Sequence, residues 1–498
     1  MTTFDSFFKT LQLDEYPFAI FSAENERRRL EQLFVKPAIY TPLVETFGQR
    51  ASVIISGERG TGKTALTYEL MRHSSDASLI VYIEDYSELP KGHVANDLYK
   101  FLIDHFSEEL LSKMTARSWL LWRLTKDERL LISYLLKFHI NNISQSRIEE
   151  KIRLVQIGVF KRVAISLYNK ARGFVNYGAS AAIDITSDII RRHFPMLPPI
   201  ESAGSREYFP ALQEGLISDI NAAKANFSLL NKVASLCKKL GFDRAVFILD
   251  KVDEEPRLEN DASEIAEFLT CLLCDNKLLL HADVQFLIAC WSIPLEQMKS
   301  RVRFQKISLQ RVTWSKVELL DILNQRLSIF SGGKLKSIYD LIDERGRADF
   351  DDILRLANGN PRDLWHLMDA ILKSEYEIDQ DSRKISEASL AFGARKFVEK
   401  FNFYEYYPRN AKARSNTMDV YSYIAHLQKL GFGKFTKNQL NEIAGTGSST
   451  SNYVVAMENM GLISKSDSKS DSGAVVYEIR DPKVLFAMEK GIQISRTA

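Results

Sequence analysis

Residues 53–64 read Val-Ile-Ile-Ser-Gly-Glu-Arg-Gly-Thr-Gly-Lys-Thr, and this stretch decides the fold. A short β-branched run ends in the pattern G-x-x-x-x-G-K-T, and residues 65–70 that follow are good helix formers. A buried strand, a glycine-rich loop and a helix N-terminus in this order are the context of a phosphate-binding loop, or P-loop. The sequence therefore predicts an α/β protein in which a parallel sheet carries this loop.

The residues of the loop have physical reasons to meet a nucleotide. Its glycines allow the backbone to curl so that N–H groups point at phosphate oxygens, and the helix N-terminus adds partial positive charge. Lys63 is expected to reach the β- and γ-phosphates, and the Thr64 hydroxyl is expected to bind Mg²⁺. ATP with Mg²⁺ is the expected ligand. The predicted nucleotide-binding residues of this segment are Gly57, Glu58, Arg59, Gly60, Thr61, Gly62, Lys63, Thr64 and Ala65.

Composition sets the broad class. The 498 residues carry 66 basic and 64 acidic side chains, so net charge argues neither for nor against nucleic acid as a partner. The length suggests about three domains. No signal-like segment and no long uncharged apolar run is visible, so we expect a cytoplasmic protein with no membrane anchor. The lone C-x-x-C pair, Cys271 and Cys274, favours core thiols over a zinc site.

A second informative segment covers residues 245–250, Ala-Val-Phe-Ile-Leu-Asp. An apolar run that ends in aspartate predicts a buried strand with a carboxylate at its C-terminal end, where open α/β sheets bind ligands. Asp250 is therefore expected to hold Mg²⁺ opposite Thr64.

Hydrolysis also needs a carboxylate that orients and deprotonates the attacking water. In many relatives a glutamate directly follows the metal aspartate, but Lys251 occupies that position here. The pattern is instead apolar-D-x-x-D-E. Glu254 is the predicted base with Asp253 as its rival, and Lys63 completes the predicted catalytic set.

Three further strands are predicted over residues 79–83, 284–292 and 305–309, which gives a five-stranded parallel sheet. Between residues 95 and 240 the pattern is helical and longer than a nucleotide-binding core requires, so we interpret it as a helical insertion. Capping boxes start helices within it at Thr125 and Ser146.

Smaller signals remain open. Ser22 is predicted to cap a helix that runs to residue 34. Tyr16 and Phe18 belong either to the core or to an adenine pocket. Ser292, at the end of a strand, is either a γ-phosphate sensor or a turn residue. Three arginines near the last strand are solvated charges or one of them is an arginine finger that acts across a subunit boundary. They are Arg301, Arg303 and Arg311.

Residues 313–410 are predicted to form a helical lid. Within it, residues 358–362 read Asn-Gly-Asn-Pro-Arg. Asn360 as N-cap and Pro361 at the first helical position start a helix, which puts Arg362 in the first turn, aimed back toward the nucleotide. Arg362 is therefore a predicted phosphate-sensing residue.

Together the P-loop, the D-x-x-D-E strand end, the helical lid and the G-N-P-R helix resemble the AAA+/STAND branch of P-loop ATPases. The prokaryotic origin-recognition-like and NACHT-like members are nearest in pattern, over residues 15–375 without the insertion. The resemblance implies nucleotide ligation by Lys63 and Thr64, a magnesium role for Asp250, catalysis by Glu254 and sensing by Arg362. Lys251 departs from the common pattern, which puts the hydrolysis rate in doubt but not nucleotide binding.

The C-terminal part, residues 411–498, changes to short helices over 418–430, 436–444 and 449–460, followed by a two-stranded hairpin. This order resembles a winged helix-turn-helix. The third helix carries no Lys or Arg, so specific DNA readout is weakly supported. Non-specific DNA contact and a protein-docking or autoinhibitory wing are equally compatible with the pattern. The predicted domains are therefore an ATPase core over residues 1–312, the lid and this module.

The resemblance implies an ATP-binding and hydrolysing molecular switch that controls a partner protein or a DNA transaction, in genome maintenance or antiviral (phage) defence. The expected partners are a separate effector or regulatory protein and further subunits of a homo- or hetero-oligomer. Two alternatives are a nucleotide-loaded DNA-binding loader with slow hydrolysis and an oligomeric scaffold that ATP holds together.

Overall fold

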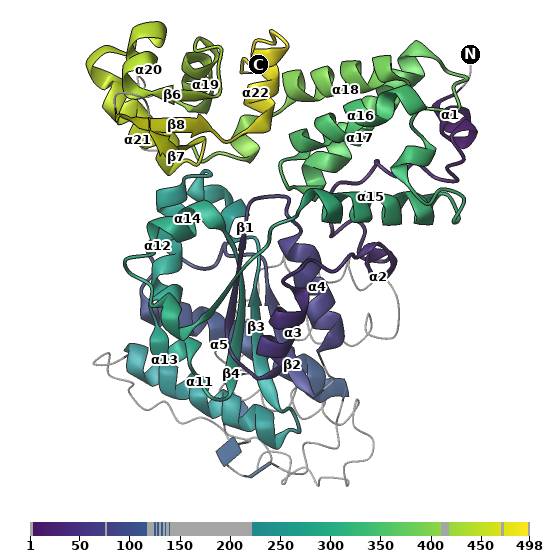
Figure 1. The fold of residues 1–498 in the computed structure, drawn as a ribbon. Coiled ribbons are helices and arrows are strands. Elements are labelled where there is room, and N and C mark those ends of the chain that lie inside the picture. The colour runs from purple at the N-terminus through teal and green to yellow at the C-terminus, as the bar shows by residue number, and fades with distance from the viewer. Residues whose placement is uncertain are drawn as a thin grey trace, which may run out of the picture. The chain divides into compact units, whose positions relative to one another are not determined.

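The computed structural model describes residues 3–74, 77–116, 222–409, 418–469 and 473–496, with isolated positions between 124 and 139 (Figure 1). Most of the predicted insertion, its capping box at Ser146 included, lies outside the described residues. The capping box at Thr125 is present, since Thr125 and Glu128 exchange the two reciprocal hydrogen bonds. Within the described ranges, no helix is both long enough and apolar enough to cross a membrane.

A five-stranded sheet has the strand order β2-β3-β4-β1-β5. Parallel pairing joins β1 to β4 and to β5, with Val53 beside Leu287 and Ser308, and it also joins β2 to β3. All residues of β1 and β4 are buried, which explains why both read as continuous apolar runs. The predicted α/β class with a parallel sheet is confirmed. The strands are β1 (Val53–Gly57), β2 (Ser78–Ile83), β3 (Arg244–Leu249), β4 (Val284–Trp291) and β5 (Ser308–Arg311).

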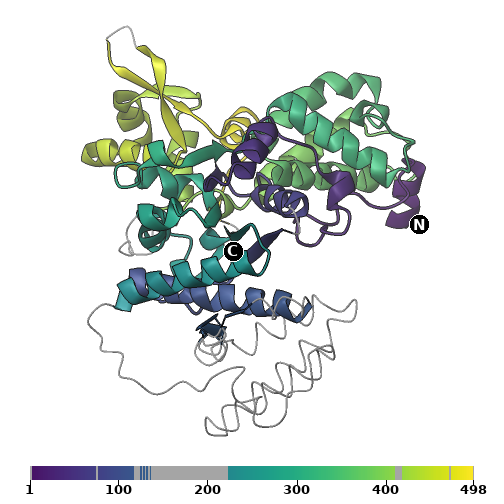
Figure 2. The same ribbon diagram turned by 90° about the horizontal axis from the view of Figure 1, so that it is seen from below.

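The chain divides into two compact units. One consists of Ser74–Leu249 and Cys271–Phe286. In this unit α5 (Ala95–Ala116) and α11 (Ala222–Lys239) lie side by side (Figure 2) and pack on β2 and β3. Shortly after α11 the chain turns at Gly241, whose φ of 87° is the left-handed conformation expected beyond a helix end.

The other unit consists of Met1–His73, Asp250–Thr270 and Leu287–Ala498, and it contains all of the predicted site residues. Its N-terminal helices pack with the helices that follow the sheet around one apolar core. Its described α-helices before the C-terminal module are α1 (Phe4–Thr10), α2 (Leu30–Leu33), α3 (Tyr40–Gly48), α4 (Lys63–His73), most of α12 (Ala262–Leu273), α14 (Ser292–Gln297), α15 (Lys316–Phe330), α16 (Arg347–Ile353), α17 (Pro361–Ile378) and α18 (Glu387–Lys400).

In the C-terminal module, a small antiparallel sheet with the order β6-β8-β7 accompanies four helices. The three predicted helices and the predicted hairpin are present, and β6 and α22 are additional. The elements are α19 (Val420–Gln428), β6 (Lys434–Thr436), α20 (Lys437–Ala444), α21 (Thr450–Asn459), β7 (Ile463–Lys469), β8 (Val475–Ile479) and α22 (Pro482–Glu489).

Two local predictions are wrong. The helix expected from Ser22 to residue 34 is reduced to turns and the short α2. The buried guanidinium of Arg326 binds the carbonyl oxygens of Pro17 and Ile20 and the carboxylate of Glu26, so side-chain bonds fix an irregular backbone here. The fifth strand was expected at residues 305–309, but residues 304–306 form a 3₁₀ turn and β5 begins at Ser308.

Candidate functional site

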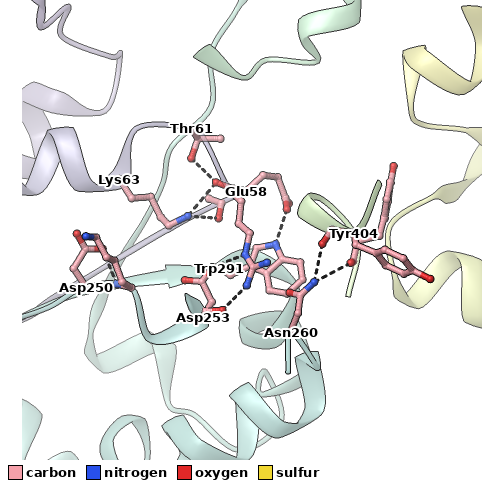
Figure 3. A network of polar contacts seen from close by, with 12 residues as sticks. Glu58, Thr61, Lys63, Asp250, Asp253, Asn260, Trp291 and Tyr404 are labelled. Atoms are coloured by element: carbon pink, nitrogen blue, oxygen red, sulfur yellow. Dashed lines mark hydrogen bonds and ion pairs between the residues drawn. The ribbon is translucent and has the colours of Figure 1, made fainter. Parts of the chain in front are cut away.

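The P-loop joins the buried end of β1 to the start of α4. Gly60 and Gly62 adopt φ angles of 83° and 87°, a conformation that side chains rarely tolerate. Lys63 Nζ lies inside the loop, 3.0 Å from the carbonyl oxygens of both Gly57 and Glu58 (Figure 3). The loop therefore holds its cation beside the backbone that would meet phosphate.

Two later segments of the chain brace this loop from outside. The indole Nε1 of Trp314 donates to the carbonyl oxygen of Thr61, at 2.8 Å. The side-chain amide of Asn360 donates to the carbonyl oxygen of Arg59, at 2.5 Å. A methyl group at Gly60 would lie 2.5 Å from Asn360 Oδ1, so only glycine lets the start of α17 approach this closely. Neither contact has a local signal in the sequence.

Asp250 follows β3 directly, at the edge where the P-loop also lies. Only 2% of its surface is exposed, and its carboxylate accepts a hydrogen bond from the Lys251 backbone amide at 2.9 Å. Burial raises the pKa of Asp250, while the neighbouring Thr64 hydroxyl and the Lys63 charge oppose that rise. A hydroxyl beside a buried carboxylate supplies the hard oxygen ligands that Mg²⁺ prefers, so Thr64 and Asp250 fit the predicted metal.

Asp253 is held by an ion pair. Arg59 Nε lies 2.7 Å from Asp253 Oδ2, both side chains are largely buried, and the guanidinium stacks 4.5 Å from the centre of the Trp291 ring. Burial alone would raise the pKa of Asp253, but the charges of Lys63 and Arg59 outweigh it and lower the pKa. Asp253 is therefore a paired anion and a poor proton acceptor.

Glu254 has different surroundings. It lines the same cleft as Lys63, Asp250 and Arg362, but much of its surface is exposed. Partial desolvation of its carboxyl raises the pKa of Glu254, and the neighbouring Asp253 charge adds to this effect. Of the two predicted bases, the structure leaves Glu254 with the more accessible and more basic carboxylate.

The first turn of α17 lies on the P-loop as the sequence predicts. Asn360 caps the helix by accepting from the Arg362 amide at 3.0 Å, and that amide also approaches the Gly60 carbonyl oxygen at 3.4 Å. Arg362 lines the cleft, as does Ala65. This arrangement brings the predicted sensor to the predicted phosphate site.

Glu58 faces away from the cleft. Its carboxylate accepts from Trp291 Nε1 at 3.0 Å (Figure 3). It also accepts from the Ser292 hydroxyl, and Arg311 lies 3.8 Å from it. The hydroxyl of Ser292 is thus bonded to the loop, which favours a structural role as a turn residue over a role in sensing the γ-phosphate. Arg311 is 60% exposed, which is compatible with either of its alternatives.

The cleft also has an apolar lining, which the sequence does not predict. Tyr16 and Phe18 belong to the core, where Tyr16 donates to Asp369 and the buried Phe18 packs on Trp365. Residues after them line the cleft instead, because Arg326 fixes their irregular path. The apolar lining is formed by Phe21, Leu30, Leu33, Phe34, Val35, Ile322 and Trp365.

No family model matches the chain, and no curated protein matches it in sequence. Among solved structures, a Walker-type ATPase of Pyrococcus abyssi is similar to it, with 11% sequence identity and a TM-score of 0.36. The alignment covers 94% of this chain and 96% of that one.

Proposed function

We propose that the protein is a P-loop ATPase that binds ATP with Mg²⁺ and hydrolyses it. One observation carries the proposal: the buried Asp250 lies beside Thr64, at the start of α4, in a cleft that Lys63, Glu254 and Arg362 also line. Two cations and an apolar lining in one cleft suit a triphosphate joined to a nucleobase.

The loop supplies binding. Its backbone N–H groups and the N-terminus of the 11-residue α4 attract phosphate oxygens, and Lys63 adds a full charge. Thr64 and Asp250 would hold Mg²⁺, which supplies charge neutralisation for the phosphate oxygens. The apolar lining would cover the adenine base of ATP and exclude water from it.

Glu254 supplies the chemistry. Its carboxylate accepts a proton from water while the water oxygen forms a bond to the γ-phosphorus and the bond to the β-phosphate oxygen breaks, giving ADP and phosphate. Arg59 neutralises Asp253, so that a second free carboxylate does not repel the phosphates. Arg362 would lie near the γ-phosphate and report its loss through α17.

We propose that this switch acts on a protein partner. The C-terminal module has the element order of a winged helix, but two of its exposed lysines lie beside acids, since Lys434 pairs with Glu478 and Lys465 pairs with Glu458. The exposed positions of α21 carry no charge, and they are Ser451, Asn452, Val455 and Asn459. This surface offers DNA phosphates little net charge. The resemblance in sequence suggests genome maintenance or antiviral defence as its setting.

Calorimetry with ATP and Mg²⁺ tests the proposal. The wild type should bind, and Lys63→Ala should lose binding because the phosphate charge loses its cation. Equal affinity of the two proteins would contradict the assignment. Phosphate release with and without duplex DNA at low salt then distinguishes a DNA-binding loader from a switch that acts on a protein. Strong stimulation of hydrolysis by DNA would favour the loader.

A further inference from the structure

Lys483, in the first turn of α22, is a buried cation of the C-terminal module. None of its side chain is exposed, and its Nζ lies 3.0 Å from Asp363 Oδ2 and 3.7 Å from Asp481 Oδ1. The ammonium also lies 4.2 Å from the ring centre of Phe401 and 4.9 Å from that of Tyr406. Every side of this charge is therefore occupied by groups that favour a cation.

Two chains of contacts connect Lys483 and its carboxylates to the P-loop. Asp363 follows Arg362 in the first turn of α17, so the carboxylate that binds Lys483 belongs to the turn that contacts Gly60. By the second route, Asn360 donates to the hydroxyl of Tyr406, at 3.3 Å, and the Tyr406 ring faces Lys483. Both routes end at residues that touch the P-loop.

The proposed hydrolysis does not use these buried charges, and packing alone does not require them. Apolar residues of similar volume often stabilise a core as well as a buried ion pair does. An ion pair tolerates less displacement than apolar packing does, because separating its charges inside the protein costs much free energy. The contact thus favours one placement of α17 against α22.

We propose that Lys483 is a positioning residue for the nucleotide site, which holds the first turn of α17 so that Asn360 and Arg362 stay on the P-loop. The inference rests on the proposed function for its effect on nucleotide affinity. Its structural part, the placement of that turn, stands independently.

The principal test compares Lys483→Met with Glu489→Gln in the full chain. Glu489 is the last residue of α22 and pairs with Arg355 at 2.7 Å, but both side chains are about half exposed. It therefore links α22 to η7 (Leu354–Ala357), whose Leu356 carbonyl also approaches Lys483. The non-hydrolysable analogue AMP-PNP with Mg²⁺ should bind about tenfold more weakly to Lys483→Met, within the usual range of coupling between sites. Glu489→Gln should bind like the wild type.

A double-mutant cycle with Asn360→Ala separates positioning from general damage. If Lys483 acts through Asn360, the double variant should lose little affinity beyond the single variants. Losses that multiply fully would overturn the proposal, as would a folded Lys483→Met with wild-type affinity.

A second variant and a second measurement separate a positioning role of Lys483 from a loss of folding. Lys483→Met leaves the buried carboxylates of Asp363 and Asp481 without their cation. The second variant is therefore Lys483→Met with Asp363→Asn and Asp481→Asn, which removes all three charges while preserving size. Hydrogen exchange of the Arg362 amide, without nucleotide, should be faster in this variant than in Glu489→Gln, and equal exchange would overturn the inference. If the wild type does not bind AMP-PNP, the proposed function fails instead, and the exchange result still decides the placement of α17.

Discussion

The side-chain amide of Asn360 donates a hydrogen bond to the carbonyl oxygen of Arg59, although 301 residues separate them. Asn360 is 1% exposed, and its Oδ1 accepts from the Arg362 amide as the N-cap of α17. One side chain therefore begins a helix and supports the phosphate-binding loop. The start of α17 and the P-loop are parts of one structure.

Asn360→Ala should affect stability and nucleotide affinity together. Loss of an N-cap costs about 1 kcal/mol of the free energy of unfolding, and loss of the bond to Arg59 should also weaken ATP binding. Ser315→Ala is the matched control, because Ser315 caps α15 with a capping box but does not line the cleft. Urea denaturation and calorimetry on both variants check this. Equal ATP affinities would show that the cap does not support the loop.

Glu254→Gln should retain ATP but hydrolyse it about 10²–10⁴-fold more slowly, which is the usual contribution of a general base. The amide keeps the size of the side chain and cannot accept the proton of water. Single-turnover phosphate release measures the chemical step, and calorimetry measures binding. A wild-type rate in this variant would remove Glu254 from the mechanism.

Asp253→Asn should destabilise the fold more than Glu254→Gln does. It leaves the largely buried Arg59 without its anion, and breaking a buried ion pair by removing one partner typically costs about 3–5 kcal/mol. The midpoint of thermal unfolding should fall in this variant and stay near the wild-type value in Glu254→Gln. If Asp253→Asn is stable and only hydrolysis is lost, Asp253 is the base.

The rate of hydrolysis should depend on pH through Glu254. A general base works when deprotonated, so the rate falls as the pH drops through its pKa, and the raised pKa of Glu254 moves this loss to a higher pH than for an ordinary glutamate. The Lys251 charge lowers the pKa of Glu254 and the Glu24 charge raises it. Lys251→Met should therefore shift the acidic limb of the rate profile upward, and Glu24→Gln should shift it downward. Shifts in the same direction would contradict this assignment.

The sequence predicts the loop, the strands and the caps because their signals are local. Residues 53–64 contain a strand, a turn and a helix start within one window, and Asn360 with Pro361 is a helix start in itself. The partners of these elements are remote in the chain. Nothing near Arg59 indicates that Asp253 binds it, and nothing near Asn360 indicates the P-loop carbonyl.

The failed helix prediction after Ser22 has the same physical origin. Its local capping signal is real, but Arg326, some 300 residues later, binds two backbone carbonyl oxygens before it and the Glu26 carboxylate within it. Contacts distant in sequence override local preference there. The Arg326 contacts also shape the apolar lining of the cleft, which no periodicity in residues 21–35 indicates.

Gly60 and Gly62 share a left-handed backbone, but their neighbours differ. A methyl group at Gly62 would meet open space, whereas at Gly60 it would collide with Asn360 and Arg362. No remote side chain of the described chain thus opposes variation at position 62, where local strain and the cleft act, while position 60 is also constrained by a segment three hundred residues downstream. We expect positions 60 and 360 to be inherited as a matched pair, so that exchanging either one between homologues would damage the recipient.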